Sequence, residues 1–292
     1  ISSRTFLQKI LSDTVLVNGK EIKQSYKLRV GDEVEVNIEK LERILNDIDR
    51  NKDIQGEMKE LNIIAENKEY LVINKPKDMV VHPGKGNSQH TLVNYIKGYL
   101  TKTGDLNKDV TRVGLVHRLD KGVSGLIIFG KTPEFQKHLQ KQFENHKVDK
   151  LYLADVYNIG KLKKYNLNIT KEIDKLIKSD MKIDNTWYCA DGYIGRNPKE
   201  RIKMKFDTRE FNNSKKALSY VKAINDKQIL IKIETGRMHQ IRATLEFLGI
   251  SIIGDTLYSK EEKDGIPKSI GLESILLSFR NISGKRITFR LY

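Results

Sequence analysis

The segment VHRLDKGVSGLIIFGKT, residues 116–132, places a group of charged side chains directly before an apolar run. His117, Arg118 and Asp120 come first, glycines follow, and LIIFG then has the composition of a buried strand. We expect the preceding residues, RVGLVHRLD, to form a strand as well. A lone aspartate between cations can be a simple salt bridge, so the meaning of Asp120 depends on what the rest of the chain brings to it.

The charge of the 292-residue chain points to an anionic partner. It carries 53 Lys and Arg against 38 Asp and Glu, a formal net charge of +15 at pH 7. Nucleic acid is the first candidate and an acidic membrane surface is the second. The chain contains no apolar run of about 18 residues, and its beginning lacks the order of a secretion signal. Together with the single cysteine, Cys189, this predicts a soluble cytoplasmic protein.

Residues 1–40 have a pattern of their own, which predicts a small domain with a helix and a hairpin. Ser2 or Ser3 can cap a helix whose apolar residues follow helical spacing. VLVNGKEI then alternates around Asn18-Gly19, a strong hairpin signal, and VGDEVEV supplies a further turn and strand. The charged segment 41–61, which has no aromatic residue, is typical of a linker.

Residues 62–292 alternate between strand-like and helix-like segments. IIAENKEYLVINKP, SGLIIFGKT, KLYLADVYNIG, YVKAIN and QILIKIETG favour strands, and TLVNYIKGYL, PEFQKHLQKQFENH and GRMHQIRATLEFLGI favour helices. This order predicts an α+β domain with a mixed, largely antiparallel sheet and flanking helices. A Lys-rich stretch near 161–188 is interpreted as an insertion.

Several chemistries are excluded by missing motifs. There is no G-x-x-x-x-G-K-[ST] loop, and Leu119 interrupts the H-R-D of a kinase catalytic loop. The six histidines form no H-E-x-x-H and have no cysteine partners, so we expect neither a metal nor a cofactor.

Four polar segments remain as a candidate site: NKPKDMVVHPGKG, VHRLDKGVSG, KLYLADV and ETGRMHQIRATL. A helix that starts near Arg237 would bury Met238 and Ile241 and leave Arg242 to pair with a carboxylate, for which Asp120 is the candidate. A carboxylate beside a cation keeps its charge at neutral pH and can act as a nucleophile without a metal. Glycoside hydrolysis uses two carboxylates, so a single one favours a reaction whose leaving group is retained.

These segments resemble motifs of the RluA/RluD-type pseudouridine synthases, and they follow one another in the same order as in that family. HRLD with KGVSGL, then Lys150-x-Tyr152, then GRMHQIR and GDTLY, carry the resemblance over about residues 63–292. Residues 1–40 resemble an S-four-like RNA-binding domain that is truncated at its N-terminus. Val123 stands where the family commonly has Thr, and Ser259 where it has Gly.

The resemblance implies a pseudouridine synthase fold with Asp120 as the catalytic carboxylate. A uridine of RNA would be flipped into the pocket, its N1–C1′ bond broken, the uracil rotated and a C5–C1′ bond made. Whether Asp120 attacks the sugar or the base, or removes a ribose proton, stays open. Tyr152 would stack on the base and help to remove the C5 proton, and Arg242 would pair with Asp120. The other expected substrate and RNA contacts are Arg118, His117, Lys75, His82, Lys150, Arg237 and His239, with Arg4, Lys9, Lys20 and Lys23 in the N-terminal domain.

His117 and His239 also fit a scaffold role, and His82 fits a simple turn residue. The sequence around VVHPGKGN makes large-subunit ribosomal RNA the expected substrate, with transfer RNA as the alternative. The rival interpretation is a catalytically silent RNA-binding or ribosome-assembly protein. A glycosylase that releases uracil would need a leaving-group acid that we do not find. We expect a monomer.

Overall fold

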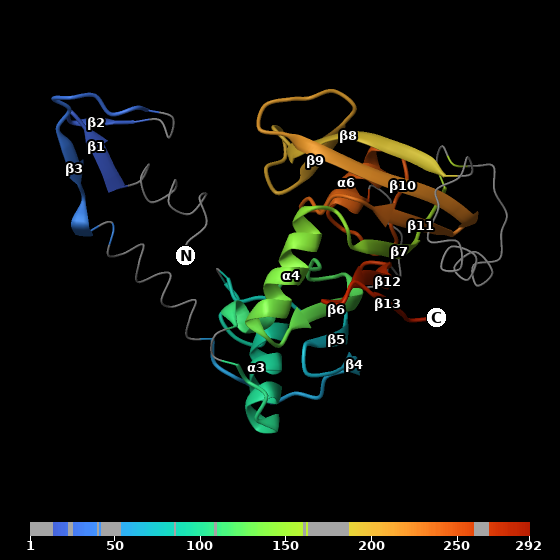
Figure 1. Ribbon diagram of the computed structural model, residues 1–292. Coiled ribbons are helices and arrows are strands. Elements are labelled where there is room, and N and C mark those ends of the chain that lie inside the picture. Colours follow the sequence, from blue (N-terminus) through green and yellow to red (C-terminus); the bar gives the residue numbers. More distant parts are fainter. Residues whose placement is uncertain are drawn as a thin grey trace. The chain divides into compact units, whose positions relative to one another are not determined.

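A computed structural model describes residues 14–22, 26–39, 41, 54–84, 86–107, 110–159, 162, 187–259 and 269–292. The chain divides into two compact units, Ile1–Gln55 and Gly56–Tyr292 (Figure 1). The division falls within the predicted linker 41–61. The predicted N-terminal helix, most of the predicted insertion 161–188, and Arg4, Lys9 and Lys23 lie outside the described residues.

The first unit contains a three-stranded antiparallel sheet in the order β2-β1-β3. Its strands are β1 Val15–Val17, β2 Lys20–Glu21 and β3 Val34–Val36. Asn18 and Gly19 connect β1 and β2 with φ of 52° and 71°, the positive values that a tight two-residue hairpin turn requires. The predicted hairpin is therefore confirmed, and Lys20 is exposed directly after its turn.

The second unit is organised around a ten-stranded sheet in the order β4-β5-β6-β12-β7-β11-β10-β8-β9, with β13 paired to β12. Within the described residues every pairing is antiparallel except that of β6 with β12. The predicted mixed, largely antiparallel sheet is confirmed. The strands are β4 Ile63–Glu66, β5 Tyr70–Lys75, β6 Ser124–Gly130, β7 Asp149–Asp155, β8 Tyr188–Arg196, β9 Met204–Asp207, β10 Lys215–Asn225, β11 Gln228–Ile233, β12 Leu272–Arg280 and β13 Arg286–Arg290.

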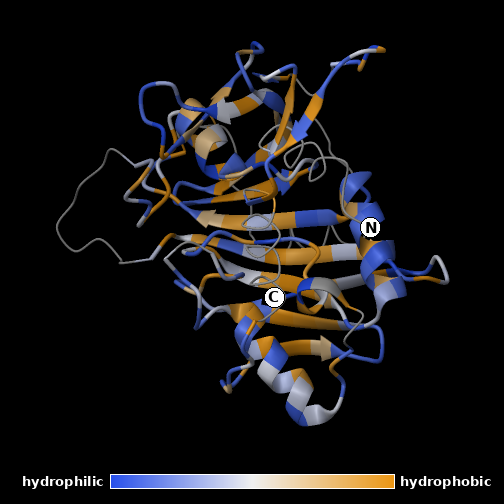
Figure 2. Cartoon of the chain, turned by 90° about the vertical axis from the view of Figure 1, so that its left-hand side faces the viewer, coloured by the Kyte–Doolittle hydropathy of each residue, from blue (hydrophilic) through white to orange (hydrophobic). Residues whose placement is uncertain are grey.

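The predicted helices appear as α3 Leu92–Thr103, α4 Pro133–Glu144 and α6 Gln240–Phe247. In α4, Thr132 accepts a hydrogen bond from the backbone of Phe135, and Pro133 occupies the first turn, two features that start a helix. Phe135 and Leu139 then pack on β6 and β12 in a buried cluster. Figure 2 shows the hydrophobic residues running along the strands, so burial between sheet and helices holds this unit together.

Two sequence predictions need correction. RVGLVHRLD is not a strand: residues 111–114 form the 3-10 helix η1 Thr111–Gly114, and a loop with a single bridge from Leu115 to Phe129 follows. Arg112 and Val113 have φ of 49° and 54°, which lie outside the β region of regular strands. Residues 187 and 188, assigned to the insertion, belong to the sheet domain, since Trp187 packs in its core and Tyr188 begins β8.

Gly125 makes possible the parallel contact of β6 with β12. It lies opposite Ser274 in the register, its φ is 108°, and a Cβ placed on it would lie 2.3 Å from the Ser274 carbonyl oxygen. A side chain here would separate the two strands directly beneath the loop that carries Asp120.

We predict that Gly125→Ala lowers the free energy of unfolding by about 3 kcal/mol or more, because clash and backbone strain add. Gly284→Ala is the control, since Gly284 has φ of 84° with nothing within 4 Å of its Cβ position; it should cost about 1 kcal/mol. Urea denaturation of both variants measures the difference. Equal losses of stability in the two variants would contradict the close approach of β6 and β12 at Gly125.

Candidate active site

A cavity of about 660 Å³ lies where the loop 115–123, β7 and the turn before α6 meet. Most of the predicted site residues of the second unit line it, although they are far apart in the sequence. Those residues are His117, Arg118, Asp120, Lys150, Tyr152, Arg237, His239 and Arg242. Lys75 and His82 are not among its lining residues.

Arg242 is the buried centre of the site. Its Nε and Nη2 donate to the two carboxylate oxygens of Asp255, both at 2.7 Å, and its Nη1 lies 3.6 Å from Oδ2 of Asp120. The predicted pairing with Asp120 is thus present, but the bidentate partner is Asp255. That residue lies in the GDTLY segment, and its role depends on a tertiary contact that the motif alone does not reveal.

The turn that delivers Arg242 differs from the predicted one. The helix begins at Gln240 rather than near Arg237, His239 has φ of 51°, and Met238 is 42% exposed. The buried Gln240 side chain accepts from the backbone of Arg237 and from Thr235, and it donates to the backbone of residue 218 and to the hydroxyl of residue 219. These four hydrogen bonds fix the turn, so Met238 faces outward.

Asp120 is partly exposed, with 25% of its side chain accessible. His239 lies next to it, with Nε2 at 4.0 Å from Oδ2, while its Nδ1 shares a hydrogen bond with the Tyr258 hydroxyl at 3.0 Å. Burial lowers the pKa of His239, although the charge of Asp120 opposes this. The imidazole is therefore neutral at pH 7, and Arg242 is the cation that faces Asp120.

Tyr152 is a buried residue of β7 that lines the same cavity as Asp120. Its hydroxyl shares a hydrogen bond with Ser274, and burial, with a contribution from the charge of Asp120, raises the pKa of the phenol. The hydroxyl therefore stays protonated at neutral pH. Its ring is available to the cavity as an apolar surface.

Lys75 does not line the cavity, although we expected it to contact RNA. Its fully buried ammonium donates to the carbonyl oxygens of Pro76, Met79 and Lys121, at 2.8, 2.9 and 3.1 Å. Burial lowers the pKa of Lys75 to about 8. Three acceptors use all of its donors, so Lys75 ties the segment after β5 to the residue that follows Asp120.

The histidines of the first two motifs make hydrogen bonds to nearby backbone groups. His82 shares a hydrogen bond between Nδ1 and the Pro83 carbonyl, at 2.8 Å. His117 accepts from the backbone of Ile128 through Nε2 at 3.0 Å, and its ring stacks on Phe143 at 4.6 Å. Burial lowers the pKa of His117 to about 3, so its ring is neutral at pH 7 where it borders the cavity.

The remaining cations differ in exposure. Arg118 is exposed, and Arg237 is half-buried with its Nε donating to the Lys216 carbonyl oxygen at 2.9 Å. Lys150 is 6% exposed. The cavity thus combines one buried ammonium with guanidinium groups that solvent can reach.

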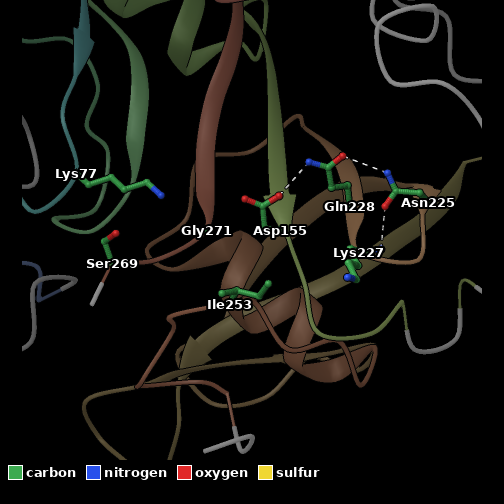
Figure 3. A pocket seen from close by; sticks show the side chains of 8 residues that line it. All are labelled: Lys77, Asp155, Asn225, Lys227, Gln228, Ile253, Ser269 and Gly271. Atoms are coloured by element: carbon green, nitrogen blue, oxygen red, sulfur yellow. Dashed lines mark hydrogen bonds between the residues drawn. The ribbon is translucent and has the colours of Figure 1, made fainter. Parts of the chain in front are cut away.

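A second cavity, of about 590 Å³, lies at the ends of β7 and β11 (Figure 3). Asp155 accepts a hydrogen bond from Gln228, which in turn accepts one from Asn225. None of the predicted site residues lines it. The first cavity is lined by most of the predicted site residues of the second unit and is therefore the candidate active site.

Neither a metal centre nor a membrane span was found in the described part of the chain. Its His, Cys, Asp and Glu residues form no group of three or more that could hold a metal ion. None of its helices is long and apolar enough to cross a membrane.

We predict that Asp255→Asn lowers the free energy of unfolding by about 3 kcal/mol, because it leaves the buried Arg242 guanidinium without its charged partner. The control is Asp207→Asn, which breaks an exposed pair with Lys205 and should cost less than about 1 kcal/mol. Urea denaturation measures both. Similar losses would show that Arg242 does not depend on Asp255.

Comparison with known proteins identifies the family to which the chain belongs. The family model described as RNA pseudouridylate synthase matches residues 69–247. An uncharacterized RNA pseudouridine synthase of Bacillus subtilis, YlyB, is 33% identical over 258 residues, which is 88% of this chain and 74% of the relative. Ribosomal large subunit pseudouridine synthase D of Escherichia coli K12 is 28% identical over 288 residues, covering 97% and 76% of the two chains.

The solved structure of human RNA pseudouridylate synthase domain containing 1 superimposes with a TM-score of 0.58 at 20% identity, covering 81% of this chain and 85% of that one. This likeness shows that the second unit has the pseudouridine synthase fold. With the match over residues 69–247 and the relative at 33% identity, the chain belongs to the RNA pseudouridine synthase family, the isomerases that convert uridine in RNA to pseudouridine.

Proposed function

We propose that this RNA pseudouridine synthase modifies large-subunit ribosomal RNA, with Asp120 as its catalytic carboxylate. The observation that carries the assignment is the position of Asp120, in a large cavity and 3.6 Å from the buried Arg242. The substrate is inferred from the likeness to ribosomal large subunit pseudouridine synthase D over 97% of this chain.

The reaction needs one carboxylate because the base both leaves and returns. A flipped uridine enters the cavity, and protein contacts offset the few kcal/mol that flipping costs; the exposed Arg118 is suited to fill the vacated space. The electron pair of the N1–C1′ bond leaves with the base. Asp120 bonds to C1′, adds to the base or takes a ribose proton. The retained base rotates, its C5 bonds to C1′, C5 loses its proton and N1 gains one.

Tyr152 has a narrower role in this proposal than its motif implies. A buried ring that lines the cavity is suited to stack on the flipped base. Its raised pKa, however, makes the phenolate a rare species at neutral pH, which argues against Tyr152 as the base that removes the C5 proton. In the route in which Asp120 bonds to C1′, its carboxylate is set free when C5 bonds to C1′ and is the better proton acceptor.

The first unit supplies further RNA contacts in this account. Lys20 is exposed beside the hairpin turn, where a cation can pair with a backbone phosphate. We propose that the protein acts as a monomer and without a cofactor.

We predict that pseudouridine mapping identifies the substrate in cells that lack this gene. Carbodiimide modification and primer extension on total RNA should show large-subunit positions that disappear without the gene and return with the wild type. Complementation with Asp120→Asn should restore none of them, since loss of a central catalytic group reduces rates by about 10³-fold or more.

Two other outcomes would redirect the assignment. If the gene-dependent positions lie in transfer RNA, the synthase stands and the ribosomal substrate is wrong. If Asp120→Asn rescues the cells as well as the wild type does and no position depends on the gene, the silent RNA-binding interpretation replaces catalysis. Matched expression of Asp207→Asn controls for an unspecific effect of removing a carboxylate.

A further inference from the structure

Lys150 lies within the active-site cavity on the same strand as Tyr152. The two residues are separated by one position in β7, so their side chains project from the same face of the sheet. Both line the cavity, and each is 6% exposed. An ammonium group is thus buried directly beside the ring on which the base is expected to stack.

The ammonium of Lys150 has neither an ionic nor a hydrogen-bonding partner among the described residues. For this ammonium no carboxylate of the described residues lies within ion-pair distance and no acceptor within hydrogen-bond distance; it makes a cation–π contact with the Phe143 ring, whose centroid is 5.9 Å away. Glu234, the residue after β11, acts on Lys150 through its charge and is paired with Lys232 at 2.7 Å. A buried charge without a partner is unfavourable, so the site favours a ligand that brings negative charge.

The other ionisable groups around Lys150 do not supply that charge. Lys232 is a cation that faces it from β11, and the neutral His117 faces it from the loop before β6. Glu144 and His146, at the end of α4, line the same cavity but make no ion pair with Lys150. Burial is the main reason that the pKa of Lys150 is lowered to about 8, which still leaves the ammonium largely charged at pH 7.

The chemistry of the proposed reaction indicates which part of the substrate brings negative charge to Lys150. A flipped nucleotide keeps its phosphates on the RNA backbone outside the pocket and sends its base inward. When the N1–C1′ bond breaks, the electron pair spreads over N1 and the carbonyl oxygens O2 and O4. Rotation by half a turn about the N3–C6 line exchanges N1 with C5 and O2 with O4. A donor beside one carbonyl therefore meets the other after the rotation.

We propose that the ammonium of Lys150 contacts a carbonyl oxygen of the flipped uracil and stabilises the negative charge of the base before and after it rotates. This inference rests on the proposed function and adds a catalytic residue to it. It holds whether Asp120 attacks the sugar, adds to the base or removes a ribose proton, because each route places negative charge on a carbonyl oxygen of the base.

The test measures single-turnover pseudouridine formation and RNA affinity separately, on an in vitro transcript of large-subunit ribosomal RNA. Lys150→Met should slow the reaction at saturating enzyme by about 10²-fold or more, the usual effect of removing a preorganised donor. Its Kd for RNA should change by less than about threefold. Lys150→Arg, which keeps the charge, should recover part of the rate.

Lys222→Met is the matched control, because Lys222 is a buried strand lysine, 2% exposed, that does not line the cavity. It should leave the rate near that of the wild type. If Lys150→Met behaves like Lys222→Met, or if it weakens RNA binding with an unchanged saturating rate, as a phosphate contact would, the inference is wrong.

The pH dependence of the rate distinguishes a catalytic role of Lys150 from a structural one, because a structural role would not change it. The charged form is the active one, so the wild-type rate should be full below the pKa of Lys150 and fall as pH rises through it; this pKa is about 8 in the protein without RNA, and contact with the base raises it in the complex. Lys150→Arg should remove this decline, since a guanidinium stays protonated. If the rate of Lys150→Arg declines with the same midpoint pH as that of the wild type, another group causes the decline. This result would contradict the proposal.

Asp120→Asn in the same assay separates the two claims. An inactive Asp120→Asn beside a fully active Lys150→Met ends the inference and leaves the proposed function intact. A fully active Asp120→Asn ends the proposed function, and the inference that rests on it falls as well.

Discussion

One buried guanidinium organises the active site. Arg242 is held in a single orientation by the bidentate pair with Asp255, whose own side chain is completely buried. Bidentate Arg–carboxylate pairs combine strength with a defined geometry, so the remaining nitrogen, Nη1, is directed to Asp120. Asp255 thereby neutralises most of the arginine's charge and keeps its position, while Asp120, at the longer distance, retains an accessible carboxylate. A direct bidentate pair with Asp120 would instead have closed that carboxylate to a substrate.

The loops around this pair are fixed by buried polar contacts rather than by regular secondary structure. Lys75 joins two loops through three carbonyl oxygens, and Gln240 uses its amide to hold the turn before α6. Gly125 allows β6 and β12 to approach beneath the Asp120 loop. Buried polar groups that are fully hydrogen-bonded specify one arrangement, and catalysis by positioning requires such precision. The cavity therefore presents preorganised groups to a base that must be held while it turns.

Local signals predicted the parts of the structure that depend on neighbouring residues. Asn18-Gly19 gave the hairpin, and Thr132-Pro133 begins α4 where the helical pattern was expected. The motifs around Asp120, Tyr152 and Arg242 pointed to residues that line the cavity. The predictions that failed concerned features that depend on contacts between residues far apart in the sequence. RVGLV has a strand-like composition, yet it forms most of η1 and the start of the loop that follows, with two left-handed residues that turn the backbone. The roles of Asp255 and Lys75 follow from partners on other segments, which spacing along the chain does not disclose.

The most direct test of the account is release of tritium from RNA that carries [5-³H]uridine, combined with analysis of the nucleoside product. Formation of the C5–C1′ bond must expel the label, so the wild type should release tritium in step with pseudouridine and liberate no free uracil. Asp120→Asn should release none while it still binds the RNA. If Asp120→Asn releases tritium as fast as the wild type, Asp120 is not the catalytic carboxylate. If the wild type produces free uracil, the enzyme does not retain the base.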